Sequence, residues 1–266
     1  MEIISIYVLK RKTTIMKIIN NMTNTHPLIV HRPGLSDVKH ESREPFVKFF
    51  NSALSMGYYF NGVKYDKSKL SIITFNNRNY KTKIEQQFKE QDITVMGKHE
   101  LEWDNVKKIT YMSQFLSDCT TPYILSLDSD DVFVKNSLIS IIPRFESMNV
   151  DMLFGATIHN FPYNIIDPFS SRLKKVTPYI YLNAGTVIFK REYGISFFNG
   201  LLGIINEFPN IKSEQGIIKL YIQKQMQEGV DIFKSVSTDY NCNIFQNIKQ
   251  LIDTRCNYGQ LEMTIL

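Results

Sequence analysis

Residues Pro122 to Val134 read PYILSLDSDDVFV and join a short apolar run to a cluster of carboxylates. The first part of this segment is rich in Tyr, Ile and Leu, which is typical of a buried strand. Asp128, Asp130 and Asp131 follow the apolar run directly. We therefore expect them at the carboxyl edge of a sheet, where open α/β sheets bind their ligands.

These carboxylates predict a site for a divalent cation. Neighbouring carboxylates repel one another unless a cation neutralises them, and oxygen ligands favour Mg²⁺, Mn²⁺ or Ca²⁺. A continued strand would point Asp128 and Asp130 to one face and Asp131 to the other, whereas an early turn would bring Asp128 and Asp131 together. A simpler interpretation is that Asp130 and Asp131 only begin the turn into the next helix, which Asn136 or Ser137 would cap.

The composition is ordinary for a globular protein. With 266 residues and 43% hydrophobic content, the chain can form one large α/β domain or two small ones. Its net charge of +5 is spread along the chain, which suits an anionic substrate and argues against a nucleic-acid partner. Met1 to Leu9 is too short and too interrupted for a membrane span or a signal peptide. Cys119, Cys242 and Cys256 form no CxxC pair, so we expect a reducing compartment and a cytoplasmic location.

From Lys69 onward the pattern predicts strands that alternate with helices. The predicted strands are residues 70–75, 93–96, 151–156, 179–189 and 230–236, and the predicted helices are residues 81–89, 104–116, 137–145, 195–208 and 213–225. Such alternation indicates parallel βαβ units and an α/β sheet of the nucleotide-binding type. The irregular stretch 157–177 is expected to be a mobile substrate loop.

The first 68 residues have a different pattern. It predicts a strand over residues 3–9, a helix over 14–21 and a strand over 27–30 that ends in His31. A polar segment, 37–44, and a short aromatic helix follow. We therefore divide the chain into an N-terminal segment, 1–68, and a main domain, 69–266.

A set of short motifs recurs in a fixed order along the main domain. They are VMG followed by Trp103 and Lys108, DSDDV at 128–132, FGAT followed by Pro162, YLNAG at 181–185, the pair Glu214 and Gln215, and DYNCNIFQN at 239–247. The ordered set, from about Leu70 to Ile248, resembles the glycosyltransferase domain of lysyl hydroxylases and procollagen glycosyltransferases. The resemblance implies a GT-A fold, with a mixed and mostly parallel sheet flanked by helices. It also implies Mn²⁺, or Mg²⁺, and transfer of a sugar from a UDP-sugar to a hydroxyl acceptor.

The resemblance assigns expected roles to the metal and donor residues. In that family the acid cluster binds Mn²⁺ on the diphosphate of a nucleotide sugar, which favours Asp128 with Asp131 as ligands. The segment containing Asn183 and Gly185 and the pair containing Gln215 line the sugar and acceptor side. The remaining donor contacts are expected from Thr74, Asn76 and Asn77 at the uracil and ribose, from Trp103 stacked on a ring, and from Lys108 beside the phosphates.

Two acids are candidates for catalysis. Glu214 is expected to be a base or an acceptor contact, because an inverting transfer needs a carboxylate that takes the proton of the acceptor hydroxyl. Alternatively, Ser213 caps a helix and Glu214 is simply a favourable acid in its first turn. Asp239 is the second candidate, and its alternative role is to satisfy the backbone groups of a turn.

The N-terminal segment resembles the closing stretch of the same family, which normally follows the FQN string. VLK at 8–10 and HPLIVHRPG at 26–34 carry this resemblance, which implies that His31 is the third metal ligand and that Lys39 or Arg32 lies near the phosphates. Either the domain is circularly permuted, or the segment is the tail of a preceding domain in a longer polypeptide. The alternative role of His31 is that of a strand-end residue without a partner.

Two rival functions fit part of the pattern. LSLDSDDVF also matches the opening motif of haloacid-dehalogenase-type phosphatases, in which Asp128 would be the nucleophile and Asp130 the general acid. Those enzymes need a second acidic pair at a later strand end, and no such pair follows Asp131 in the sequence. A non-catalytic module that binds a nucleotide sugar is the third possibility, because Thr157 stands where the family commonly has an acid. We expect a metal-dependent glycosyltransferase.

Overall fold

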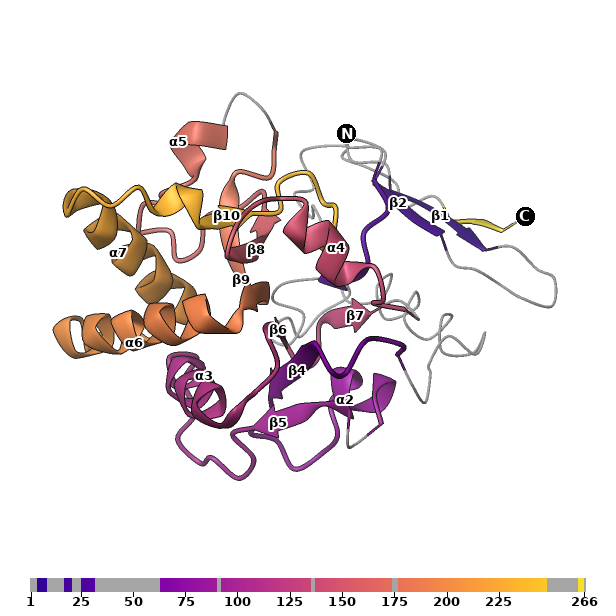
Figure 1. Cartoon of the computed structure of the whole chain (residues 1–266), viewed down its shortest axis with the longest axis horizontal. Helices are drawn as coiled ribbons and strands as arrows, with labels where there is room; N and C mark the ends of the chain where they lie inside the picture. The colour runs from indigo at the N-terminus through magenta and orange to yellow at the C-terminus, as the bar shows by residue number, and fades with distance from the viewer. Residues whose placement is uncertain are drawn as a thin grey trace.

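The computed structural model describes residues 4–8, 17–20, 25–31, 63–89, 92–134, 137–173, 177–247 and 263–265. A six-stranded sheet with the order β10-β8-β9-β6-β4-β5 runs through its main body (Figure 1). Its strands are β4 (Leu70–Phe75), β5 (Thr94–Met96), β6 (Tyr123–Leu127), β8 (Met152–Thr157), β9 (Tyr181–Lys190) and β10 (Val236–Thr238). Strand β9 is antiparallel to both of its neighbours, whereas the other pairs are parallel. The sheet is therefore mixed and mostly parallel, as the sequence predicts.

Helices cover both faces of this sheet. They are α2 (Lys83–Gln87), α3 (Lys107–Asp118), α4 (Ile141–Glu146), α5 (Ser170–Leu173), α6 (Arg191–Glu207), α7 (Glu214–Gln227) and the short 3₁₀ helix η3 (Ile232–Lys234). In β4, Ile73 packs in the apolar cluster under α3, α6 and α7, whereas Ile72 packs in the cluster with α2 and α4. This alternation follows from the two-residue period of a strand, and Figure 1 shows the two groups of helices on opposite sides.

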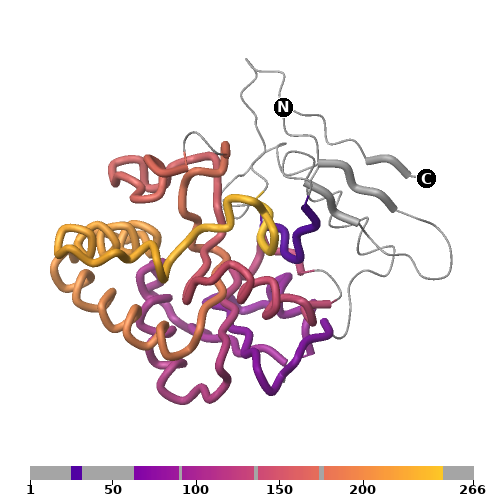
Figure 2. Tube along the Cα trace, turned by 45° about the horizontal axis from the view of Figure 1, so that its top comes forward, coloured from indigo at the N-terminus to yellow at the C-terminus, as the bar shows by residue number. Residues whose placement is uncertain are grey.

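A second sheet packs in the same cluster as α2 and α4. It has three strands, β11 (Phe245–Asn247), β3 (Ile29–His31) and β7 (Val132–Val134), in that order. Strand β3 lies in the middle, parallel to β11 and antiparallel to β7, and its three residues are buried. Figure 2 shows residues 25–31, in indigo, beside the yellow end of the main body. Residues 25–31 are therefore part of the fold formed by residues 63–247.

A third small sheet brings the described ends of the chain together. Strand β1 (Ile4–Val8) pairs with β12 (Met263–Ile265) in parallel and with β2 (Lys17–Asn20) in antiparallel fashion. The prediction of a helix over residues 14–21 is wrong for the part that the structure describes, because Lys17–Asn20 are a strand paired along their length with β1. Pairing with a partner strand overrides a local pattern of this kind.

The strand predicted over residues 230–236 is also wrong in most of its length. Helix α7 ends at Gln227, and Gly229 just after it has a φ of +81°. The backbone N–H of Val230 donates to the carbonyl of Gln225, which closes the end of the helix. The chain then forms η3, and β10 begins only at Val236.

Among the residues that the structure describes, no helix has the length and apolar character needed to cross a membrane.

Candidate functional site

A pocket of about 530 Å³ lies at the carboxyl ends of β4 and β6. Its walls come from six places: the residues that follow β4, the segment that leads into α3, the turn 128–131, the loop after β8, the residues 183–185 of β9, and the start of α7. His31 reaches the same pocket from β3. This is the sheet edge at which the sequence predicts a ligand site.

His31, Asp128 and Asp131 form the group in this pocket that can hold a metal ion. One ligand atom from each lies within 4.8 Å of the others. The Nε2 atom of His31 is 3.6 Å from a carboxylate oxygen of Asp128 and 3.5 Å from one of Asp131. Strand β6 ends at Leu127 and β7 begins at Val132 in a different sheet, so the chain turns early between them. The early turn is the alternative that brings Asp128 and Asp131 together.

The His31 side chain is buried, and its two ring nitrogens have no hydrogen-bond partner among the described residues. Burial lowers the pKa of His31, but the carboxylates of Asp131 and Asp128 outweigh it, so the pKa is raised overall. Nε2 faces the two carboxylates at 3.5–3.6 Å, and a neutral imidazole nitrogen is a common metal ligand. The residues therefore fit a divalent ion.

Gly185 makes room for this group. A Cβ atom at Gly185 would lie 2.2 Å from Cε1 of His31 and 2.5 Å from Oδ2 of Asp128. The Gly185 carbonyl also accepts a hydrogen bond of 2.7 Å from the backbone N–H of Asp128, and its own N–H donates to the side chain of Asn183. The groups that approach Gly185 are the side chains of His31 and Asp128. Asn183 and Gly185 both line the pocket.

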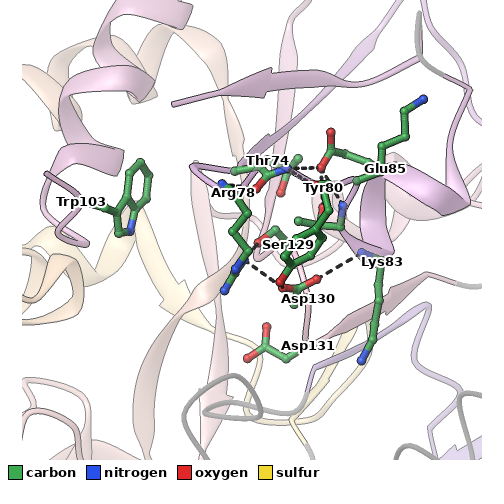
Figure 3. A network of polar contacts seen from close by, with 12 residues as sticks. Thr74, Arg78, Tyr80, Lys83, Glu85, Trp103, Ser129, Asp130 and Asp131 are labelled. Carbon is green, nitrogen blue, oxygen red and sulfur yellow. Dashed lines mark hydrogen bonds and ion pairs between the residues drawn. The ribbon is translucent and has the colours of Figure 1, made fainter. Parts of the chain in front are cut away.

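Asp130 is not part of the metal group, in contrast to our expectation. Its carboxylate lies 2.9 Å from Nη1 of Arg78, and it accepts from the hydroxyl of Tyr80 and the backbone N–H of Lys83 at the start of α2 (Figure 3). Figure 3 shows Asp131 turned away from these partners. The tight turn sends neighbouring side chains in different directions, so Asp130 faces α2 while Asp131 faces His31.

Lys108 links the metal group to Glu214. Its ammonium is 2.5 Å from Oδ1 of Asp128 and 3.3 Å from Oε2 of Glu214. Burial lowers the pKa of Lys108, but these two carboxylates raise it well above its usual range. Burial raises the pKa of Glu214 to about 7, with Lys108 acting in the opposite direction and Asp128 adding to the rise. Glu214 can therefore exchange a proton near neutral pH.

The start of α7 confirms Ser213 as a helix cap, with Glu214 in the first turn. The Ser213 hydroxyl accepts from the backbone N–H of Gly216, so Ser213 is the helix cap that the sequence predicts. Gln215, the next residue, accepts from the backbone N–H of Ala184 and donates to the carbonyl of Phe161. Gln215 thus connects β9 to the loop after β8. Ser213, Glu214 and Gln215 all line the pocket.

Trp103 lines the pocket, and Tyr111 and Gly97 pack against its indole ring. Its ring stacks on Tyr111, with centroids 6.2 Å apart and planes 11° apart. A Cβ at Gly97 would lie 2.7 Å from the indole, and Gly97 has a φ of +81° that also favours glycine. The indole therefore has a defined position on the pocket wall.

Three predicted site residues do not line the pocket: Thr74, Asn76 and Asp239. The Thr74 hydroxyl donates to the carbonyl of Leu127, and the Asn76 amide donates to the carbonyl of Tyr80 and to Glu85. Asp239 accepts the backbone N–H groups of Asn243, Ile244 and Phe245. All three are buried, and they satisfy backbone groups of turns that would otherwise lack partners. Lys39 lies outside the described residues.

Several residues that line the pocket were not identified from the sequence, among them Arg78, His159, Phe161 and Tyr163. The last three lie in the stretch expected to be a substrate loop, and Phe161 and Tyr163 are exposed aromatic residues, which is the signal that could have found them. Buried Lys219 holds this loop through Oδ1 of Asn160, the carbonyl of Phe161 and the carboxylate of Asp167. Arg78 follows the end of β4 by three residues and has no distinctive signal in the sequence.

Comparison with models of known protein families gave no match, and a search of curated proteins found no significant similarity to this chain.

Proposed function

We propose that this chain is a metal-dependent glycosyltransferase with a GT-A type fold, which moves a sugar from a UDP-sugar to a hydroxyl acceptor. The observation that carries the proposal is the group of His31, Asp128 and Asp131 in a pocket at the carboxyl edge of the sheet. The buried imidazole faces both carboxylates and has no hydrogen bond to any residue that the structure describes, which supports a bound ion there. The ordered motifs that resemble procollagen glycosyltransferases support UDP as the carrier.

The size and lining of the pocket suit a nucleotide sugar. A volume of about 530 Å³ falls in the ordinary range for a small-molecule site. One wall offers the aromatic ring of Trp103, and the deeper part offers the cation of Lys108 beside the acids. An elongated ligand with a flat base at one end and an anionic diphosphate at the other matches this distribution of groups.

Breaking the bond between a sugar and a phosphate requires stabilisation of the departing diphosphate. Bound Mn²⁺ or Mg²⁺ would supply Lewis-acid stabilisation of that charge. His31, Asp128 and Asp131 would hold the ion, and Lys108 adds a fixed positive charge from α3. Asn183 and Gly185 on β9 border the same space and can contact the sugar hydroxyls.

Glu214 is the base in this proposal. A carboxylate with a pKa of about 7 is partly ionised at neutral pH and can take the proton of an acceptor hydroxyl. Its position at the first turn of α7, beside Lys108, keeps the carboxyl group at the pocket wall. The loop with His159, Phe161 and Tyr163 borders the same side and is available for contacts with the acceptor.

The contacts of Asp130 favour transfer over the phosphatase alternative. A phosphatase of that type would use Asp128 as nucleophile and Asp130 as its general acid. Here Asp130 is paired with Arg78, and Asp128 is paired with Lys108 and faces His31. The Asp130 carboxylate is thus engaged with Arg78 and the start of α2, rather than with the group that Asp128 would attack.

A panel of UDP-sugars, assayed for UDP release with Mn²⁺, tests the proposal. We expect one or more donors to be turned over by the wild type and Asp128→Asn and Asp131→Asn to lower the rate by roughly 100-fold or more, because each removes a charged ligand. Asp118→Asn is the matched control, because Asp118 is an exposed acid at the end of α3. Release that is equally fast in all variants would contradict the proposal.

A further inference from the structure

Arg78 is a pocket residue whose guanidinium is held in one orientation. Its Nη1 atom is 2.9 Å from Asp130 and 3.3 Å from the hydroxyl of Ser129. Its backbone N–H donates to the side chain of Asn76, so the main chain at Arg78 is fixed as well. The side chain is 32% exposed, which leaves part of it open to the pocket that it lines.

Asp130 is itself fixed, which makes the pair a rigid unit. The hydroxyl of Tyr80 and the backbone N–H of Lys83 both donate to the carboxylate of Asp130. The guanidinium also lies 5.8 Å from the centre of the Tyr80 ring. Asp130 thus orients Arg78 and neutralises its charge.

Trp103 stands on a separate wall of the same pocket. Figure 3 shows Trp103 and Arg78 apart from each other, with no other labelled side chain between them. Tyr111 and Gly97 fix the indole from its other sides. The pocket therefore presents two flat groups, an indole and a guanidinium, each held in position by residues behind it.

Flat groups of this kind bind flat ligands. Nucleobases stack on aromatic side chains and on the guanidinium plane of arginine, and such stacking depends little on which base is present. The charge of Arg78 is offset by Asp130, so the pair attracts a neutral ring more than it attracts a phosphate. Asp130 is also outside the metal group, so the Arg78–Asp130 pair is not among the residues expected to hold the ion.

We propose that Arg78, oriented by Asp130, is the nucleobase-binding residue of this pocket and forms one wall of a slot whose other wall is Trp103. The inference rests on the proposed function and names the part of the donor that the slot receives, which is the base of a nucleoside diphosphate. Arg78 contacts the base directly, and Asp130 is a positioning residue that acts through Arg78.

Intrinsic fluorescence offers a direct test, because Trp103 is the only tryptophan in the chain. UDP, UMP and inorganic pyrophosphate are titrated with Mg²⁺ into the wild type, Arg78→Ala, Arg78→Gln and Asp130→Asn, with calorimetry as a second readout of affinity. We expect both Arg78 variants to bind UDP and UMP about tenfold more weakly and to bind pyrophosphate as the wild type does. Asp130→Asn is expected to weaken UDP binding by a smaller factor. Arg78→Gln retains a hydrogen-bonding group toward Asp130 and keeps the test valid if Arg78→Ala does not fold.

Arg172→Ala is the matched control. Arg172 is exposed, lies over the ring of Phe233 at 4.3 Å and does not line the pocket, so UDP affinity should not change. Unchanged UDP affinity in both Arg78 variants would overturn this inference alone. An equal loss for UDP and pyrophosphate would overturn it too, because Arg78 would then bind phosphate. A wild type that binds neither UDP nor UMP would overturn the proposed function together with this inference.

Discussion

The six-stranded sheet and the three-stranded sheet β11-β3-β7 are assembled in different ways. Strands β4, β5 and β6 of the large sheet follow one another along the chain, and helices connect them. The small sheet instead joins residues 29–31, 132–134 and 245–247, which are more than 100 residues apart in sequence. Each sheet contributes to the candidate site, but only the first can be inferred from local patterns.

The metal group lies at the junction of these two sheets. Asp128 and Asp131 occupy the turn that leaves β6 of the large sheet and enters β7 of the small one, and His31 ends β3 beside β7. A bound ion would therefore connect the sheets as well as bind substrate. Substitutions at the junction, in the small sheet and beside the large sheet test the contribution of each part separately.

Gly185→Ala should have the largest effect, because it acts at the junction itself. The added Cβ would lie 2.2 Å from His31 and 2.5 Å from Asp128. Overpacking of this kind costs about 3 kcal/mol, and it should also displace both proposed metal ligands. Urea denaturation measures the free energy of unfolding, and calorimetry with Mn²⁺ measures the loss of metal affinity.

Gly203→Ala is the control for this change. Gly203 lies in α6, and a Cβ there would meet no atom within 4 Å. Alanine is favoured over glycine in a helix by about 0.5–1 kcal/mol, so this variant should be slightly more stable than the wild type. If Gly185→Ala were as stable as Gly203→Ala and bound Mn²⁺ normally, the junction would not be as closely packed as described.

His31→Ala should remove most of the stabilisation that Mn²⁺ gives the wild type. A ligand that binds only the folded state at a hundredfold excess over its Kd stabilises it by about 2.7 kcal/mol. The free energy of unfolding is measured for each variant with Mn²⁺ and with a chelator, and only the difference is compared. His26→Ala, a change at an exposed histidine of the same segment, should keep the full difference. If Mn²⁺ stabilised His31→Ala and His26→Ala equally, His31 would not be a metal ligand.

Asp239→Asn tests the small sheet alone. Asp239 accepts the N–H groups of Asn243, Ile244 and Phe245, which lead into β11. An amide replaces one acceptor oxygen with a donor, so at least one of these buried N–H groups loses its partner, at a cost of about 2 kcal/mol. Asp231→Asn, at an exposed acid beside η3, should cost much less in the same denaturation measurement. Equal costs would mean that the Asp239 turn does not hold β11 in place.

The large sheet was predictable because its information is local. The apolar run before the acids became β6, the strand predicted over residues 70–75 is β4, and the predicted cap Ser213 does begin α7. The direction of each side chain after a strand end was not predictable. Asp130, Thr74 and Asp239 look like ligands in the sequence, but distant backbone groups and Arg78 determine where they point.

The small sheet could not be derived from periodicity. The strand ending in His31 was predicted from its own residues, but its pairing with β7 and β11 depends on segments far away in the chain. Only the family resemblance pointed to His31, and the structure brings its side chain to the two acids. Arg78 had no signal at all, because its role depends on Asp130 turning toward it.

Glu214→Gln should have the smallest effect, a change in how stability depends on pH. Burial raises the pKa of Glu214 to about 7, with Lys108 opposing and Asp128 adding to the shift, so the folded protein binds this proton more tightly than the unfolded chain does. The stabilisation from the bound proton is fully present below the unfolded pKa and is lost as the pH rises through the folded pKa. Without metal, the wild type should therefore lose about 1 kcal/mol relative to Glu214→Gln between pH 5 and pH 6.

Urea denaturation at several pH values, in the presence of a chelator, measures this difference. Glu192→Gln is the matched control, because Glu192 is an exposed acid at the start of α6 and its loss should give a curve parallel to the wild type. Parallel curves for Glu214→Gln as well would mean that the carboxyl group has an ordinary pKa. Glu214 would then be fully ionised at neutral pH and a weaker base than the proposed mechanism requires.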